Sequence, residues 1–134
     1  MNYLKGLNLT DFEKELYDGK SYKKEKIFKK DHRKYGFDVR TTWNLDTTLL
    51  LDIYARLNAY LEHNNVDLTF HKVINYNKKQ VTLDKIIDDI LEDIKFIINS
   101  YNDTDLLLNH NNRIKGIRKR MFYNLSVALP YLWW

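Results

Sequence analysis

The chain has 134 residues, the size of one ordinary domain, and 44% of them are hydrophobic, which is enough to build a packed core. It has no cysteine, which excludes disulfide scaffolds, zinc ribbons, iron–sulfur sites and thiol catalysis. The net charge is +4, and no apolar run approaches the roughly 20 residues of a membrane span. We therefore expect a single domain over residues 1–134, located in the cytoplasm and with no membrane partner.

The N-terminal region, residues 1–40, is expected to form a basic arm that carries one short helix. Thr10 and Glu13 have the spacing of a capping box, in which each residue's side chain accepts a hydrogen bond from the other's backbone N–H. Gly19 is expected to end this helix at about residue 17, because glycine readily takes the left-handed conformation that follows helices. Residues 20–40 then hold nine Lys or Arg against three acidic residues.

Residues 41–134 are expected to form a helical core, because apolar side chains recur there every three to four residues. Helices are predicted over residues 46–62 and 82–101, and from residue 113 into the C-terminus. The first of these should stop at His63, whereas Pro130 should loosen the last turn of the final helix because it lacks an N–H.

The apolar faces of two of these helices are particularly clear. Helix 82–101, with Thr82 as its cap, carries one continuous apolar stripe: Leu83, Ile86, Ile87, Ile90, Ile94, Ile97, Ile98 and Tyr101. The final helix places the following apolar residues on one side: Ile114, Ile117, Met121, Leu125, Ala128, Leu129 and Leu132.

A small β-hairpin is predicted over residues 73–82, with a polar turn in which Asn77 tolerates the required conformation. A two-stranded hairpin is marginal alone, so this one should pack on the helices. Just before it, Val66, Leu68 and Phe70 alternate with polar residues, which is typical of a strand. The predicted fold class is mainly α: a bundle of three to four helices, with a small β-hairpin between the second and third helices and a basic N-terminal arm.

Two basic clusters are the candidate binding surfaces for nucleic acid or a partner. The first, in the arm, consists of Lys23, Lys24, Lys26, Lys29, Lys30, Arg33 and Lys34, and the second of Arg118, Lys119 and Arg120. Aromatic residues such as Tyr22 and Phe28 lie among the basic residues of the arm. Bases stack on aromatic rings while Lys and Arg neutralise phosphates, which favours single-stranded nucleic acid. The alternative is a solvated arm whose aromatic residues anchor it to the helices.

The C-terminal pair, Trp133 and Trp134, has two interpretations. Exposed tryptophans are typical of binding hot spots for a protein partner. More often such residues fold back onto the core, where their indole N–H groups find acceptors.

The sequence carries no catalytic signature. No Gly-x-Ser-x-Gly elbow and no glycine-rich phosphate loop occurs, and no two histidines are three or four residues apart. Asp84, Asp88 and Glu92 share one face of helix 82–101, which suits either a divalent-metal or general-acid site or a face that is solvated or paired with the basic start of the final helix. The second interpretation is favoured. We expect a protein that is not an enzyme and that has no cofactor and no metal.

Several short motifs resemble small phage and prophage proteins of low-GC Gram-positive bacteria, to which no activity is assigned. The resemblance spans about residues 39–134, outside the basic arm. It rests on a tetrad that opens a helix, Trp43-Asn44-Leu45-Asp46, then Arg56-Leu57-Asn58-Ala59-Tyr60, Phe70-His71-Lys72 and a Leu-Pro-x-x-Trp-Trp end. It implies a phage origin.

Small phage proteins without catalytic residues often bind a host machine. The leading hypothesis is therefore a phage-encoded, non-enzymatic binding protein that engages a host protein or nucleoprotein complex, such as an anti-CRISPR or other anti-defence inhibitor. The second is a single-stranded nucleic-acid-binding protein for phage replication or packaging, and the third is a self-associating structural component. Under the first, charge reversal in the basic clusters should abolish binding and leave thermal stability nearly unchanged.

Overall fold

The computed structural model describes residues 2–11, 13–14, 30, 33–36, 42, 45–68, 73–103 and 111–132. Its long helices are α3 (Leu45–Leu68), α4 (Leu83–Tyr101) and α6 (Asn111–Ala128). A hairpin of β1 (Val73–Tyr76) and β2 (Lys79–Thr82) lies between α3 and α4, and the short 3-10 helices η1 (Asn2–Leu4) and η3 (Leu129–Tyr131) lie near the ends. The mainly α fold and the position of the hairpin are confirmed.

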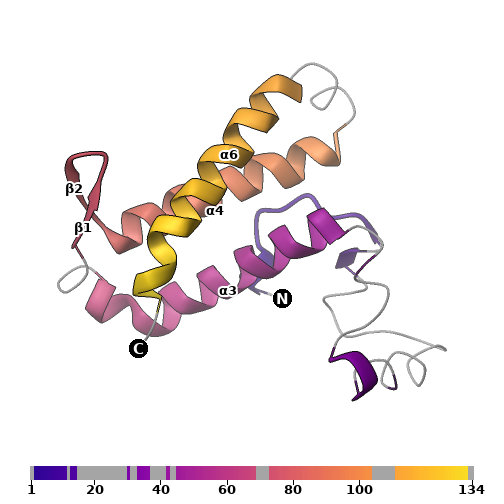
Figure 1. Ribbon diagram of the computed structural model, residues 1–134. Helices are drawn as coiled ribbons and strands as arrows, with labels where there is room; N and C mark the ends of the chain where they lie inside the picture. Colours follow the sequence, from indigo (N-terminus) through magenta and orange to yellow (C-terminus); the bar gives the residue numbers. More distant parts are fainter. Residues whose placement is uncertain are drawn as a thin grey trace.

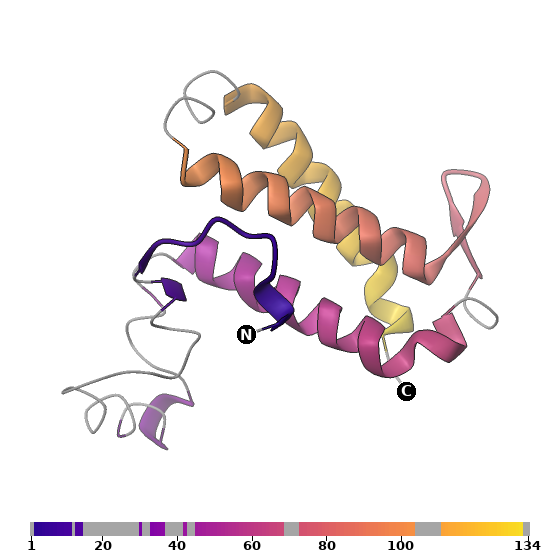
Figure 2. The ribbon, with the colours of Figure 1, turned by 180° about the vertical axis from the view of Figure 1, so that it is seen from behind.

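Helix α4 is the centre of the bundle, since it packs against both α3 and α6, as Figures 1 and 2 show from opposite sides. Its predicted apolar stripe is confirmed, because every member except the half-buried Tyr101 is buried. Thr82 occupies the predicted cap position, but its side chain makes no capping hydrogen bond. A helix this apolar on one face gains most of its stability from burying that face.

Helix α3 is longer than the sequence predicts. The predicted stop at His63 is wrong, and so is the strand predicted from Val66, Leu68 and Phe70, because the helix continues to Leu68. Asparagine is only a weak helix breaker, so Asn64 and Asn65 do not end a helix that is already formed. Phe70 lies outside the described residues, as do Trp43 and Asn44 of the tetrad. Leu50, Leu51, Tyr54 and Leu57 of α3 are buried.

The hairpin is antiparallel, with Val73 opposite Thr82 and Tyr76 opposite Lys79. Its two-residue turn has φ values of 48° at Asn77 and 66° at Lys78. Positive φ at both central residues is the geometry that favours the right-handed twist of a tight hairpin. Ile74 is 2% exposed and anchors the hairpin in the core, as predicted for a hairpin that cannot stand alone.

The N-terminal segment is held against the end of α4. The predicted capping box is present: the Thr10 N–H donates to Glu13 Oε2 at 2.8 Å, and the Glu13 N–H donates to Thr10 Oγ1 at 3.3 Å. The Asn8 N–H donates to Asn99 Oδ1 at 2.7 Å, and the Asn102 side chain donates to the Asn8 carbonyl. The predicted end of the short helix lies outside the described residues.

Helix α6 ends where Pro130 predicts, because the α-helix stops at Ala128 and the chain tightens into η3. The prediction that Leu129 lies on the apolar side is wrong, since Leu129 is 58% exposed. The change from α to 3-10 geometry alters the rotation per residue and turns this side chain outward. None of the helices in the described ranges combines the length and apolarity that crossing a bilayer requires.

Candidate binding site

Helix α6 carries five basic residues and no acidic one: Arg113, Lys115, Arg118, Lys119 and Arg120. The three arginines are held by α4. The Arg113 guanidinium lies 4.9 Å from the centre of the Phe96 ring. Arg118 lies 5.9 Å from the centre of the Tyr101 ring and also donates a hydrogen bond to the Tyr101 hydroxyl.

Arg120 forms the strongest contact between α6 and α4. Its Nε donates to Asp93 Oδ2 at 2.9 Å, and its Nη2 donates to Asp93 Oδ1 at 2.5 Å. The Asp93 side chain is 8% exposed, so the arginine satisfies both oxygens of a nearly buried carboxylate. One acidic residue of α4, outside the predicted face of Asp84, Asp88 and Glu92, is therefore paired with the final helix.

The two lysines of α6 differ from its arginines. Lys115 and Lys119 are exposed, and no described residue pairs with either of them. One and two turns further along, Phe122 is 47% exposed and Tyr123 is 49% exposed. Positions four, seven and eight residues apart lie on the same side of a helix, so these four side chains form one surface. We call it the basic–aromatic face.

The remaining predicted site residues fall into two groups. The following lie outside the described residues: Lys23, Lys24, Lys26, Lys29, Trp133 and Trp134. Lys30, Arg33 and Lys34 are described and exposed, and the Lys34 ammonium lies 5.0 Å from the centre of the Tyr35 ring. In the second cluster Lys119 is free of described partners, whereas Arg118 and Arg120 also connect α6 to α4. We therefore do not expect charge reversal at those two arginines to leave stability unchanged.

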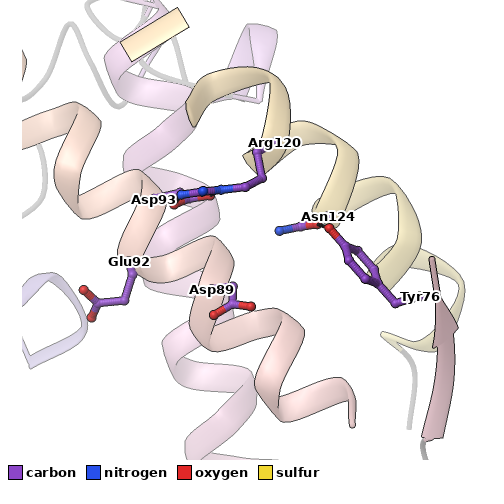
Figure 3. Close-up of a pocket in the computed structure, with 6 residues that line it drawn as sticks. All are labelled: Tyr76, Asp89, Glu92, Asp93, Arg120 and Asn124. Atoms are coloured by element: carbon purple, nitrogen blue, oxygen red, sulfur yellow. Dashed lines mark hydrogen bonds and ion pairs between the residues drawn. The ribbon is translucent and has the colours of Figure 1, made fainter. Parts of the chain in front are cut away.

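A cavity of about 290 Å³ lies between α4, α6 and the hairpin. Its lining is mostly polar and consists of Tyr76, Asp89, Glu92, Asp93, Arg120 and Asn124. Figure 3 shows the Glu92 carboxylate directed away from Arg120, whereas Asn124 and Asp89 face the space between the helices. This cavity is the second candidate site.

Asn124 is the buried polar residue of this cavity, with 3% of its surface exposed. Its Oδ1 accepts a 2.7 Å hydrogen bond from the Tyr76 hydroxyl. Its Nδ2 points into the cavity in Figure 3, and none of the described residues accepts a hydrogen bond from it. The Asn124 side chain is buried, but its Nδ2 is open to the cavity, so this N–H group is available to a ligand or to water.

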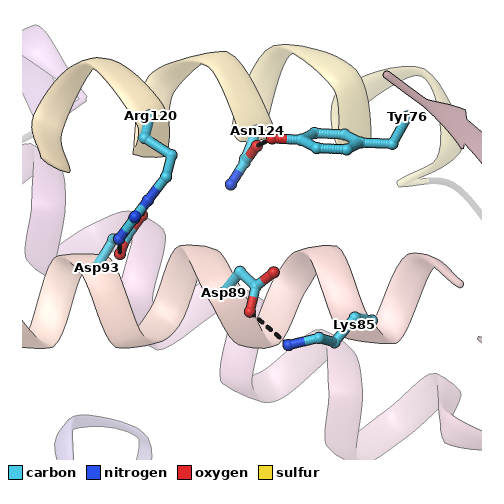
Figure 4. A network of polar contacts seen from close by, with 6 residues as sticks. All are labelled: Tyr76, Lys85, Asp89, Asp93, Arg120 and Asn124. Carbon is cyan, nitrogen blue, oxygen red and sulfur yellow. Dashed lines mark hydrogen bonds and ion pairs between the residues drawn. The ribbon is translucent and has the colours of Figure 1, made fainter. Parts of the chain in front are cut away.

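Asp89 supplies the opposite kind of group. Its Oδ1 accepts from the Lys85 ammonium at 2.8 Å, as the dashed line in Figure 4 marks. This hydrogen bond and the charge of Asp89 raise the pKa of Lys85. Both side chains are about half exposed, so the pair is solvated and Asp89 retains lone pairs for a further donor.

The cavity continues into a smaller, more apolar part of about 100 Å³. The two parts share Tyr76, Asp89 and Asn124, and the smaller one adds Val81, Lys85 and Ile86. The Tyr76 ring also meets the Tyr123 ring edge to face, with 5.9 Å between their centres. The site thus has a polar end, an apolar end and an aromatic wall.

Comparison of the chain with protein-family models, with curated proteins and with solved structures finds no match in any of the three. Its function therefore has to be argued from its own residues.

Within the described ranges, no three His, Asp or Glu side chains converge in the way that a metal ion requires. Asp84, Asp88 and Glu92 do share one face of α4, but partial burial, followed by the charge of Asp84, raises the pKa of Asp88. His63 is the described histidine, and its Nε2 lies 3.4 Å from the Tyr3 hydroxyl.

The sequence analysis did not single out Asn124, Asp93 or Tyr76. A usable signal was present, since Asn124 lies three residues after Met121 and four before Ala128, within the apolar side of α6. Asp93 likewise lies three residues after Ile90 in the stripe of α4. A polar residue at an apolar position of a helix indicates a buried polar contact. Which partner it contacts depends on how the helices pack.

Proposed function

We propose that this chain is a phage-encoded, non-enzymatic binding protein that engages a host protein or nucleoprotein complex as an anti-defence inhibitor of the anti-CRISPR kind. The observation that carries the proposal is the basic–aromatic face of α6. Lys115 and Lys119 are exposed beside Phe122 and Tyr123, while the three arginines of the same helix contact α4. If all five basic side chains of α6 contacted α4, the helix would offer no such surface.

The chemistry of this face favours an anionic partner that also has apolar surface. Exposed lysines attract phosphates or acidic side chains and steer association. Aromatic residues contribute a large share of the energy of protein interfaces. Exposed apolar area continues past the end of α6, because Leu129 is 58% and Tyr131 is 37% exposed.

The alternative function is a single-stranded nucleic-acid-binding protein for phage replication or packaging. The same four side chains support it, since phosphates pair with lysines and bases stack on aromatic rings. The two functions differ in whether a protein target is needed and in how steeply affinity falls with salt.

The test compares two double variants that remove the same charge from different places. Lys115→Gln/Lys119→Gln alters the basic–aromatic face, and Lys5→Gln/Lys14→Gln removes two exposed lysines near the N-terminus. Partner capture from host lysate and anisotropy of labelled single-stranded DNA and RNA across a salt series are the readouts. We expect the first variant to lose binding and the second to retain it.

Each outcome has a distinct meaning. Capture of a host complex that is lost only in the α6 variant supports the leading function. Direct binding of bare single strands, with a salt slope that falls by about 1.4 when two lysines are removed, supports the alternative. Equal losses in both variants would mean that only net charge matters, and the basic–aromatic face would then have no specific role.

A further inference from the structure

We infer that the cavity between α4, α6 and the hairpin binds a heterocyclic base whose edge presents a carbonyl oxygen next to a ring N–H. This inference goes beyond the proposed function and does not depend on it. It rests on a donor from a buried side chain, Asn124, and an opposing acceptor, Asp89, that face the same space, as Figures 3 and 4 show.

The donor is the Asn124 amide. The Tyr76 hydroxyl donates to Asn124 Oδ1 at 2.7 Å, and in this arrangement Nδ2 is directed into the cavity. Asn124 is 3% exposed, and no described residue accepts from Nδ2, so the acceptor has to come from a ligand or from water. Beside it, Arg120 uses Nε and Nη2 on Asp93 and keeps further N–H groups for the same carbonyl oxygen.

The acceptor is the Asp89 carboxylate. Asp93 is less accessible, because its side chain is 8% exposed and each of its oxygens already accepts from Arg120. Asp89 pairs with Lys85 through Oδ1 alone, and an ionised carboxylate accepts up to about four hydrogen bonds. A ligand N–H that reaches Asp89 would form a charge-assisted hydrogen bond.

The shape of the cavity favours a planar ring. The polar end meets the edge of the ligand, while Val81, Ile86 and the Tyr76 ring line the smaller, apolar part. Heterocyclic bases combine a polar edge with apolar faces and stack on aromatic side chains. A simple cation fits less well, since Lys85 and Arg120 lie beside the acidic groups and the Asn124 N–H faces the same space.

The acceptor that Asn124 and Arg120 share decides which bases fit best. Uracil, thymine, hypoxanthine and guanine present a carbonyl oxygen, which has two lone pairs, next to a ring N–H. Adenine and cytosine present an unprotonated ring nitrogen next to an amino group, so with the ring turned over they can also meet Asn124 and Asp89. A ring nitrogen has a single lone pair and cannot accept from Asn124 and Arg120 together, so these two bases should bind more weakly.

The experiment uses uncharged nucleosides, so the lysines of α6 and their phosphate contacts play no part. Inosine and adenosine form one matched pair and uridine and cytidine another, because within each pair mainly this edge differs. Nuclear magnetic resonance titration of the ¹⁵N-labelled full chain gives the affinity and reports directly on the Asn124 side-chain amide. We expect inosine and uridine to bind with a Kd of about 0.1–1 mM, at least about tenfold tighter than adenosine and cytidine.

Two variants test whether the acceptor is the Asp89 carboxylate. Asp89→Ala removes the carboxylate and should weaken inosine binding by about tenfold or more. Asp46→Ala removes an exposed carboxylate of α3 that lines neither part of the cavity, so its Kd should stay within about threefold of the parent value. Circular dichroism checks that both variants remain folded.

The base has two potential sources, a free nucleoside or nucleotide and an unpaired base in a single strand. Short oligouridine that displaces inosine and binds more tightly than uridine identifies the strand, whereas exclusion of the oligonucleotide identifies the free molecule. Equal affinity for inosine and adenosine would overturn the inference. So would the absence of a saturable shift at Asn124 with every nucleoside, and neither result bears on partner binding by α6.

Discussion

Arg120 holds the carboxylate of Asp93 through two hydrogen bonds, of 2.9 Å from Nε to Oδ2 and of 2.5 Å from Nη2 to Oδ1. The two side chains differ in burial, because 8% of the Asp93 side chain is exposed and 59% of the Arg120 side chain is exposed. The carboxylate is the group that needs its partner, since water can solvate the guanidinium if the pair is broken.

Replacing Arg120 with alanine should destabilise the fold. The change leaves the buried Asp93 carboxylate without its partner, at a cost of about 1–3 kcal/mol. The neighbouring Lys119→Ala is the matched control and should change the free energy of unfolding by less than about 0.5 kcal/mol. Urea denaturation followed by circular dichroism measures both. The double variant Asp93→Ala/Arg120→Ala should regain part of the loss, and equal stability of the two single variants would contradict this account.

The hairpin turn offers a stabilising substitution. Lys78 has a φ of 66°, a conformation that costs most residues energy but that glycine adopts freely. Lys78→Gly completes the Asn-Gly pair that two-residue hairpin turns favour, and should raise the free energy of unfolding by about 0.5–1 kcal/mol. Lys79→Gly is the control, because Lys79 lies in β2, where glycine should destabilise. If both variants lose stability in urea denaturation, the turn is not strained.

Glu13 connects the N-terminal segment to the bundle through a hydrogen bond with Asn102. It is 6% exposed and accepts hydrogen bonds from the Thr10 N–H at 2.8 Å and from Asn102 Nδ2 at 3.3 Å. Glu13→Ala leaves these donors without their acceptor and should cost about 1–2 kcal/mol. Hydrogen exchange of residues 7–14 should speed up, whereas exchange in α6 should hardly change. The exposed Lys14→Ala is the control, and an equal effect from it would show that the contacts of Glu13 are dispensable.

Asp88 should make the protein more stable when its carboxyl group is protonated. Partial burial and the charge of Asp84 raise the pKa of Asp88 above its ordinary value of 3.8. The folded state therefore binds this proton more tightly than the unfolded state. Above the folded pKa, the ionised Asp88 carboxylate lowers the free energy of unfolding by its full amount. This loss of stability disappears as the pH falls to 3.8 and below. Asp88→Asn should raise the melting temperature at pH 7 but not below pH 3.8. A gain of equal size at both pH values would rule out titration of Asp88 as its cause.

Local features were predictable from the sequence. The stripe of α4, the capping box of Thr10 and Glu13, the hairpin and the altered last turn at Pro130 each follow from spacing or backbone chemistry within a few residues. The end of α3 was not predictable in this way, because the residues after His63 favour helix and coil almost equally.

The partners of the charged and polar side chains were decided by tertiary structure. The sequence alone shows that five basic residues lie in the final helix. Only the packing of α6 on α4 determines that Arg120 pairs with Asp93 while Lys115 and Lys119 stay exposed. The cavity has the same origin, since Asn124 and Asp89 belong to different helices and face each other only in the folded bundle. The spacing of apolar residues in the sequence indicates which side of a helix is buried. The relative rotation and offset of two helices determine which side chains contact each other.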